Sequence, residues 1–280
     1  MALDTHSTIA FIGGGNMASA LIGGLLKAGR AAATLLVIDP FEPQRQKLQA
    51  DFGVRTAASV DQAGGLAEAG ALVWAVKPQL FAQAAAPCAG RLGGALQLSV
   101  MAGIRCDTIA RATGVAPQHA RIVRTMPNTP ALIGRGIAGL YATPAVAADE
   151  RAFVEQVLAP TGQTLWVDRE ADLDAVTALS GSGPAYVFYL VEAMIAAAQQ
   201  MGLSAEQGRR LALATFDGAT ALAAASHESP AVLRERVTSK GGTTFAALES
   251  LHADAVADAV VRAVQAAQQR ARELGDEFGG

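Results

Sequence analysis

Short apolar runs alternate with longer amphipathic stretches between Thr8 and Val167. Seven runs have the length and composition of buried strands: TIAFIG, LLVID, ALVWAV, LQLSV, ARIVRT, GIAGLYA and TLWV. Residues 16–28 and 42–52, which lie between the first of these runs, have helical length and composition. Nearly unbroken apolar strands separated by helices are typical of βαβ units in a mainly parallel, doubly wound sheet. The pattern therefore predicts an α/β fold of the nucleotide-binding type.

After Asp168 the strand pattern stops and the chain is predicted to be helical nearly throughout. The expected helices are residues 171–179, 183–201, 205–225, 230–237, 243–251 and 253–274. Residues 183–201 are apolar on every face, and such a helix needs burial on all sides. About 110 residues can hardly supply that burial alone, so we expect this region to dimerise. The alternative is a self-contained, alanine-rich bundle.

Composition and charge exclude several classes of protein. The chain has 22 Lys and Arg against 25 Asp and Glu, no basic run and 5% aromatic residues, which argues against a nucleic-acid partner. Cys88 and Cys106 are too few for a disulfide framework, and with four scattered histidines they form no metal-ligand spacing. We therefore expect no metal and a reducing compartment, the cytoplasm.

The run from Thr8 to Leu26 contains no charged residue and could be mistaken for a signal or membrane segment. It contains five glycines and Asn16, however, and no Lys or Arg precedes it. We expect no membrane association.

The first predicted strand ends in FIGGGNMASAL, where Gly13, Gly15 and Ala18 fit the pattern G-x-G-x-x-[GA]. The run follows a strand, opens a helix and precedes Asp39, at the end of the next strand, by 21 residues counted from Ala18. In a Rossmann unit Gly13 makes the tight turn, Gly15 lets a pyrophosphate approach and Ala18 permits helix packing. We predict a dinucleotide-binding Rossmann domain over residues 1–168 and an all-α dimerisation domain over residues 169–280.

Asp39 bears on the choice of dinucleotide. A carboxylate at this position can accept a hydrogen bond from a ribose 2′-hydroxyl and would repel a 2′-phosphate. The position therefore favours NADH over NADPH, although Arg45 could reach back and offset the charge.

Two further loops follow strands of the predicted parallel sheet. In WAVKPQ, Lys77 is placed to meet a phosphate or ribose and Pro78 stiffens the turn. In RTMPNTP, two prolines fix a loop that presents Asn128 and Thr129, which can border a nicotinamide. A solvated lysine and a plain rigid turn are the alternatives.

VTSKGGTTFAALE, residues 237–249, breaks the helical region with two glycines, four hydroxyls and a new helix start at Thr243. Glycines, hydroxyls and a helix N-terminus together suit an anion. The order of residues does not fit a phosphate loop, and LSGSGPAY lacks the first glycine of a nucleophile elbow. Glu228, just before another predicted helix, has no sequence signal beyond an N-terminal helix charge.

In this order, FIGGGNMA, WAVKPQ, RTMPNTP, ALSGSGPAYVF and LRERVTSKGGTT resemble the signatures of the pyrroline-5-carboxylate reductase family over nearly the whole chain. The family reduces a cyclic imine to proline. The resemblance implies interlocked helical domains in a homodimer, active sites between the dinucleotide-binding domain of one subunit and the helical domain of another, and in many members rings of dimers.

The resemblance also implies roles for individual residues. The substrate carboxylate would be held by the Ser239 side chain and the N–H groups of Gly242 and Thr243, and Thr244 would hydrogen-bond the ring nitrogen. Glu228 would contact the imine side through water, which makes Thr244 and Glu228 the expected catalytic residues. The residues expected around NADPH or NADH are Gly13, Gly15, Asn16, Met17, Asp39, Ala75, Val76, Lys77, Pro78 and Asn128.

The chain departs from the family pattern at two positions. Lys240 stands where the family usually has proline, and Asp39 is followed by Pro40 where many members carry small polar residues. Two rival functions stay open: a β-hydroxyacid dehydrogenase, which needs a base such as Lys240, and a dinucleotide-sensing module without chemistry.

Overall fold

The computed structural model describes residues 6–92 and 94–278. Contacts divide the chain into two compact units. The sheet unit contains the chain up to Ser182 together with the residues from Ala267 onward, and the helical unit is Gly183–Ala266. Each unit has its own architecture.

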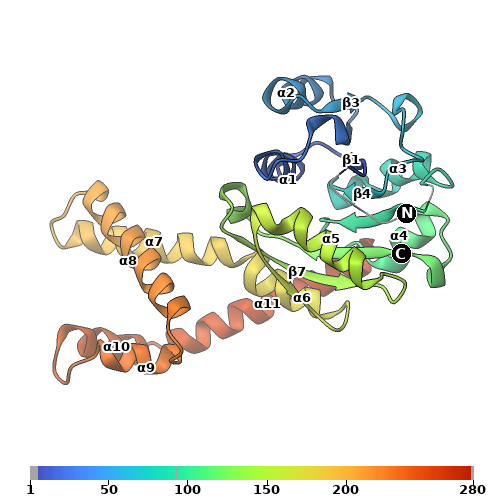
Figure 1. Cartoon of the computed structure of the whole chain (residues 1–280). Helices are drawn as coiled ribbons and strands as arrows, with labels where there is room; N and C mark the ends of the chain where they lie inside the picture. Colours follow the sequence, from blue (N-terminus) through green and yellow to red (C-terminus); the bar gives the residue numbers. More distant parts are fainter. Residues whose placement is uncertain (1–5, 93, 279–280) are drawn as a thin grey trace. The chain divides into compact units, whose positions relative to one another are not determined.

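The sheet unit is built on eight strands in the order β3-β2-β1-β4-β5-β6-β7-β8 (Figure 1). Neighbouring strands are parallel, except that β6 and β7 are antiparallel. Four strands, β1, β2, β4 and β5, are buried at every position, as their apolar sequences predict. The strands are β1 (Ile9–Ile12), β2 (Leu35–Ile38), β3 (Arg55–Ala57), β4 (Ala71–Trp74), β5 (Leu96–Ser99), β6 (Ile122–Met126), β7 (Gly136–Ala142) and β8 (Gly162–Trp166).

Helices cover both faces of this sheet. Side chains of α1 (Asn16–Lys27), α2 (Glu42–Phe52) and α5 (Ala148–Leu158) enter one core cluster, and those of α3 (Phe81–Ala85) and α4 (Cys106–Thr113) enter another. The predicted doubly wound Rossmann-type fold is confirmed. Short 3₁₀ helices complete the unit at Ala32–Thr34, Val60–Gln62, Pro78–Leu80, Ala86–Cys88, Pro117–His119, Thr129–Ile133 and Ala159–Thr161.

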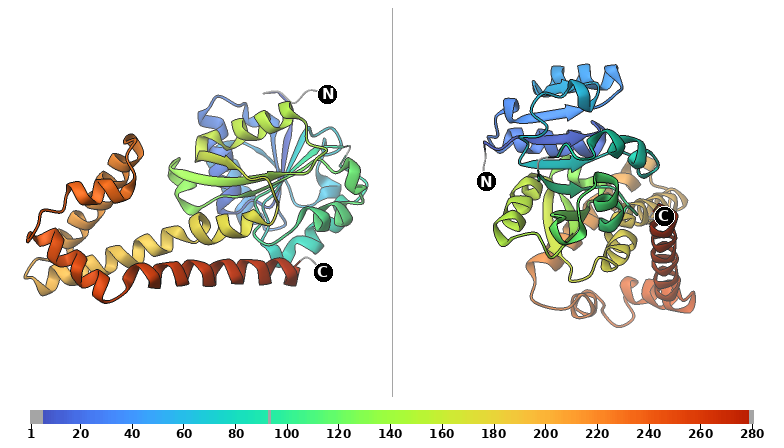
Figure 2. Two further views of the ribbon diagram at one scale, coloured as in Figure 1. Left: turned by 90° about the horizontal axis from the view of Figure 1, so that it is seen from below. Right: turned by 90° about the vertical axis from the view of Figure 1, so that its right-hand side faces the viewer.

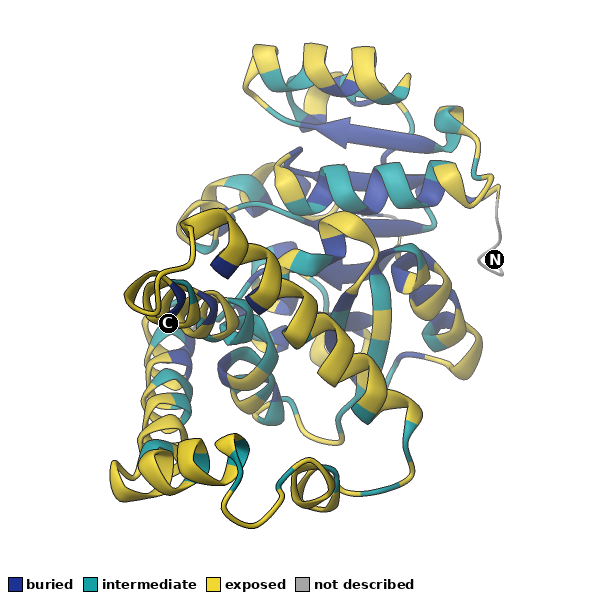
Figure 3. Ribbon diagram, turned by 90° about the vertical axis from the view of Figure 1, so that its left-hand side faces the viewer, coloured by how far each residue is buried: buried dark blue, intermediate teal, exposed yellow. Residues whose placement is uncertain are grey.

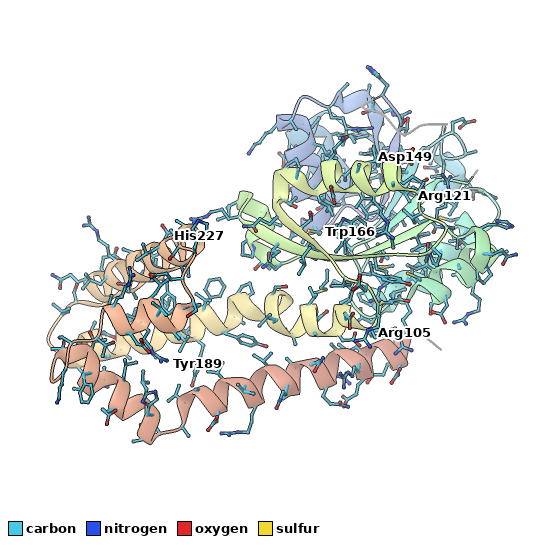
Figure 4. The ribbon with its side chains drawn as sticks, turned by 60° about the horizontal axis from the view of Figure 1, so that its bottom comes forward. Arg105, Arg121, Asp149, Trp166, Tyr189 and His227 are labelled. Carbon is cyan, nitrogen blue, oxygen red and sulfur yellow. The ribbon has the colours of Figure 1, made fainter. Side chains whose placement is uncertain are left out.

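The sheet unit extends beyond the predicted domain boundary at Asp168. Helix α6 (Asp172–Val176) and the π-helix Thr177–Gly181 pack on the sheet, where Val176 lies against Gly139 of β7. The end of the chain also returns to this unit, as the ribbon in Figure 2 shows. Arg105, labelled in Figure 4 and just before α4, has its Nη2 2.5 Å from Asp276 Oδ1 in the last turns of the C-terminal helix. The contacts therefore divide the chain after Ser182.

The helical unit contains α7 (Gly183–Gln200), α8 (Ala205–Ala225), α9 (Pro230–Arg236), α10 (Thr243–Ala253) and the first part of α11 (Val256–Phe278). Ser204 caps α8 through a reciprocal pair of hydrogen bonds with Gln207. Gly208 of α8 permits close approach to α7, since a Cβ there would lie 2.8 Å from the Cβ of Ala198. Figure 3 shows α8, α9 and α10 largely in the colour of exposed residues. Within the described ranges, no helix combines the length and apolar character needed to cross a membrane.

Two of the predicted helices differ most from the structure, and the helices predicted at 183–201, 230–237 and 243–251 end one or two residues from the predicted position. The predicted helix 171–179 is α6 followed by a π-helix that ends at Gly181, and the last helix begins at Val256 rather than at residue 253. Ala255 has a φ of 50°, a left-handed conformation that separates α10 from α11. Periodicity of apolar residues does not reveal either change.

Candidate functional site

A cavity of about 570 Å³ opens at the carboxyl ends of the parallel strands. Its lining includes the glycine run after β1, the residues after β2 and the residues after β4. Because β1 lies between β2 and β4 in the sheet, this is the point where the strand order reverses, which is where open α/β sheets bind ligands. The topology therefore places the candidate site where the sequence predicts it.

The three consecutive glycines after β1 differ in their surroundings. Gly13 has a φ of 95°, and a Cβ there would lie 2.7 Å from the carbonyl oxygen of Ala75. A Cβ at Gly14 would lie 2.6 Å from Leu48 Cδ1, whereas one at Gly15 would meet no heavy atom within 4 Å. Gly13 therefore makes the tight turn, and Gly15 leaves the start of α1 open to a ligand.

The carboxylate of Asp39 joins the end of β2 to the glycine run. Its Oδ2 accepts a hydrogen bond from the N–H of Gly14 at 2.8 Å, and its Oδ1 accepts one from the N–H of Phe41 at 2.8 Å. Arg45 does reach back, but its Nη1 donates to the carbonyls of Asp39 and Pro40, at 2.8 and 2.9 Å. The charge of Asp39 therefore lies at the cavity with both oxygens held by main-chain donors.

The other residues predicted to surround a cofactor fall into two groups. Ala75, Val76 and Lys77 line the same cavity as Gly13, Gly15 and Asp39. Asn16 and Met17 form the first turn of α1, and Pro78 lines a separate cavity of about 450 Å³. Their cofactor contacts stay predictions.

Asn128 lies beyond the carboxyl end of β6, where its side chain makes two hydrogen bonds within the protein. Its Nδ2 donates to the carbonyl of Ser180 at 3.2 Å, and its Oδ1 accepts from the N–H of Ile137 at 3.0 Å. The predicted contact of Asn128 with a cofactor stays a prediction. In the structure both ends of its amide are engaged in hydrogen bonds within the protein.

An ion pair between a buried arginine and a half-buried glutamate lies along the same strand. Arg124 Nη1 is 2.8 Å from Glu170 Oε1, which also accepts the N–H of Cys106 at 2.7 Å. Arg124 is 6% exposed. Burial raises the pKa of the Cys106 thiol far above its ordinary value, so this cysteine is a packing residue rather than a nucleophile.

The loop before α10 forms the second predicted part of the site, within the helical unit. Gly242 is the N-cap residue of α10, with no side-chain cap and no acidic residue in the first turn. Gly241 has a φ of 75°, and a Cβ at Gly242 would lie 2.6 Å from Ser239 Oγ. The loop thus brings Ser239, Gly242, Thr243 and Thr244 to the start of an 11-residue helix, an arrangement that can bind an anion.

Glu228 lies before α9 in the same unit. Its carboxylate Oε1 is 2.5 Å from Arg236 Nη2, and its N–H donates to Ser226 Oγ at 3.0 Å. Lys240 is exposed in the loop before α10. The catalytic roles of Glu228 and Thr244 stay predictions.

Several cavity residues were not predicted from the sequence. Phe41, which is 64% exposed, lies at the cavity with Ser59 and Val60, which follow β3. Strand β3 has only three residues, of which one is buried, so neither apolar run nor alternation indicates it. Among the residues described, no group of three or more His, Cys, Asp or Glu side chains could hold a metal ion.

Comparisons with known proteins agree over both units. The family described as "Pyrroline-5-carboxylate reductase dimerisation" matches residues 170–274, and "NADP oxidoreductase coenzyme F420-dependent" matches residues 8–103. The pyrroline-5-carboxylate reductase of Pseudomonas aeruginosa is 44% identical, covering 97% of this chain and 98% of that protein. That of Haemophilus influenzae is 42% identical, covering 87% and 88%.

Solved structures are similar over the same extent. A pyrroline-5-carboxylate reductase from Coxiella burnetii superimposes with a TM-score of 0.89 at 35% identity, covering 96% of this chain and 98% of that one. A pyrroline carboxylate reductase from Plasmodium falciparum with NADP bound gives a TM-score of 0.85 at 27% identity, covering 97% and 99%.

Proposed function

The chain belongs to the pyrroline-5-carboxylate reductase family, and from that premise we propose that it reduces the cyclic imine pyrroline-5-carboxylate to L-proline with NAD(P)H, the final step of proline biosynthesis. The observation that carries the proposal is the pairing of two features in one chain. A glycine-lined cavity at the sheet's switch point suits a dinucleotide, and an uncapped helix start flanked by hydroxyls suits a carboxylate.

The cavity residues fit a dinucleotide. Gly15 leaves open space at the start of α1 for a pyrophosphate, and Lys77 lies at the end of the neighbouring strand. We propose that Asp39 faces the adenine-side ribose, where its carboxylate would accept the 2′-hydroxyl of NADH and disfavour the 2′-phosphate of NADPH. The preference for NADH is therefore part of the proposal, even though the Plasmodium falciparum relative has NADP bound.

The loop before α10 would hold the substrate. Ser239 and the N–H groups of Gly242 and Thr243 would bind the carboxylate, and Thr244 would hydrogen-bond the ring nitrogen. Glu228, which is held by Arg236, would act on the imine side through water.

The chemistry asks little of acids and bases. When bound, the dihydronicotinamide would supply the hydride, which would add to the C=N carbon of the protonated imine, the carbon that becomes C5 of proline, while the electron pair of the C=N bond moves to nitrogen. The protein needs to hold the ring in place and exclude water. A site of hydroxyls and main-chain donors is sufficient for that task.

We also propose that the protein works as a homodimer formed through the helical unit and assembles further into rings of dimers. In the single chain, α7 exposes large apolar side chains: Phe188 is 60% and Tyr189 72% exposed, and Met201, which directly follows the helix, is 74% exposed. Figure 4 shows Tyr189 on α7. Apolar surface of this extent is typical of an interface. The match to the dimerisation family supports this assignment. Two free, buried thiols are in keeping with the cytoplasm.

The experiment is to follow nicotinamide absorbance with pyrroline-5-carboxylate and either NADH or NADPH, and separately with a β-hydroxyacid and NAD⁺ or NADP⁺. We expect oxidation of NADH and NADPH by the imine, faster with NADH. Turnover of the hydroxyacid alone would favour a dehydrogenase. Cofactor binding without any turnover would favour a sensing module.

A further inference from the structure

Three alternate residues along β6 and its extension contact the segment that leads from the sheet unit into α7. Arg124 pairs with Glu170, Met126 packs on Gly181, and Asn128 binds Ser180. Residues two apart on an extended chain share a face, and Asn128 keeps the extended conformation with φ −126° and ψ 166°. One face of this strand therefore forms the surface on which residues 170–181 pack.

The contact between Met126 and Gly181 is close, and a larger residue at position 181 would require the Met126 side chain to shift. A Cβ on Gly181 would lie 2.7 Å from Met126 Cε. This face of β6 thus packs closely against the π-helix Thr177–Gly181. Single-turn π-helices are found frequently at functional sites.

The carbonyl of Ser180 lies where the α-helical hydrogen-bond pattern is interrupted. The N–H of Ser182 donates to the carbonyl of Thr177, five residues earlier, at 2.8 Å. In a continuous α-helix the carbonyl of Ser180 would accept from the N–H of residue 184, but that residue is Pro184, which has none. The hydroxyl of Ser180 does not help, because it donates to the carbonyl of Val176.

The side chain of Asn128 donates to this carbonyl, at 3.2 Å. Its other end is fixed as well, since Oδ1 accepts from the N–H of Ile137 at the start of β7. With a donor required at Ser180 and an acceptor required at Ile137, only one orientation of the amide satisfies both. An unsatisfied carbonyl at this half-buried position would cost free energy, so the amide stabilises the π-helix.

We propose that Asn128 is a positioning residue, which replaces the helix donor that Pro184 removes and thereby fixes the π-helix and the loop at the carboxyl end of β6. It acts through Ser180 and Ile137 and not through a contact of its amide with the cofactor. The expected effect on turnover rests on the proposed function, whereas the hydrogen bond itself can be tested without it.

The test is a double-mutant cycle of Asn128→Ala and Pro184→Ala, in which the Pro184→Ala change restores an N–H for the Ser180 carbonyl. We expect Asn128→Ala to lower kcat at least tenfold while the Kd for NADH stays within about twofold of wild type. In the Pro184→Ala background the same change should lower kcat by threefold or less. Gln118→Ala, which removes an exposed amide before β6, is the matched control and should leave kcat unchanged.

Equal losses in the two backgrounds would overturn the proposal, as would a loss that appears as a weaker Kd for NADH. If Asn128→Ala does not fold, Asn128→Asp takes its place, because it keeps the acceptor for Ile137 and removes the donor to Ser180.

Hydrogen–deuterium exchange separates this inference from the proposed function. Exchange at residues 177–183 should rise at least tenfold in Asn128→Ala and return to within threefold of wild type in the double variant. If the wild-type protein does not reduce the imine, the proposed function fails while this exchange experiment still decides the role of Asn128. Unchanged exchange in Asn128→Ala contradicts that role.

Discussion

Replacing Asp39 by serine is the sharpest perturbation of the proposed cofactor site. The carboxylate accepts main-chain N–H groups from Gly14 and Phe41, both at 2.8 Å, and lies at the cavity lining. Serine is short and neutral, so Asp39→Ser removes the charge and the proposed acceptor for a ribose hydroxyl. It also removes the hydrogen bond that the N–H of Gly14 donates to Oδ2.

The expected magnitude follows from these contacts. A hydrogen bond to a charged group contributes about 1.5–3 kcal/mol, and about 1.4 kcal/mol corresponds to tenfold. Loss of the proposed ribose contact should therefore lower kcat/KM for NADH by roughly 10- to 100-fold. NADPH makes no such contact and is relieved of repulsion, so the ratio of kcat/KM for NADPH to that for NADH should rise at least tenfold.

The assay measures kcat/KM for both dinucleotides at saturating pyrroline-5-carboxylate in wild type, Asp39→Ser and Asp51→Ser. Asp51 is a matched control on α2, where it pairs with Lys47 at the surface. A ratio that changes by less than threefold in Asp39→Ser would refute the assignment of Asp39 to the ribose. A wild-type preference for NADPH above tenfold would refute it as well.

Three further predictions concern substrate binding and stability. Thr244→Ala should lower turnover by one to three orders of magnitude, the scale of losing a transition-state hydrogen bond, and wild-type kinetics would remove Thr244 from the site. Glu170→Gln should lower the free energy of unfolding by roughly 2–3 kcal/mol in urea titrations because it removes the negative charge that compensates the buried Arg124 guanidinium; Asp172→Asn, from an exposed pair with Arg169, is the control and should change it little. Burial raises the pKa of Asp174, so its contribution to stability is full at low pH and is lost as pH rises through the folded-state pKa. Asp174→Asn should accordingly raise Tm at pH 7 by about 1–3 °C with the difference fading below about pH 4, and a difference that grows toward low pH would contradict the sign.

The sheet was predictable where the sequence carries a strong apolar signal. Each of the seven predicted strand runs overlaps a strand, and the four strands buried at every position, β1, β2, β4 and β5, have the nearly continuous apolar residues that burial on both faces requires. Strand β3 has one buried residue among three and escapes any such pattern. The antiparallel direction of β7 could have been predicted, since the nine residues 127–135 are too few for a parallel crossover.

The candidate site likewise has features that the sequence predicts and features that it does not. Glycine spacing and the position of Asp39 are local in sequence, and the structure brings Gly13, Gly15, Asp39 and Lys77 to one cavity. The bond from Asn128 to Ser180 spans 52 positions and depends on the hydrogen-bond register of a π-helix. Neither this long-range hydrogen bond nor the π-helix produces a periodic pattern in the sequence. Pro184 does indicate that the carbonyl four residues earlier cannot accept the usual α-helical hydrogen bond.

Transfer of deuterium tests the proposed reaction most directly. The protein is incubated with pyrroline-5-carboxylate and NADH deuterated at both C4 positions, and the proline formed is analysed by mass spectrometry and NMR. We expect each proline to carry one deuterium, bound at C5. Proline without deuterium, or oxidation of the cofactor without formation of proline, would contradict direct hydride transfer to the cyclic imine.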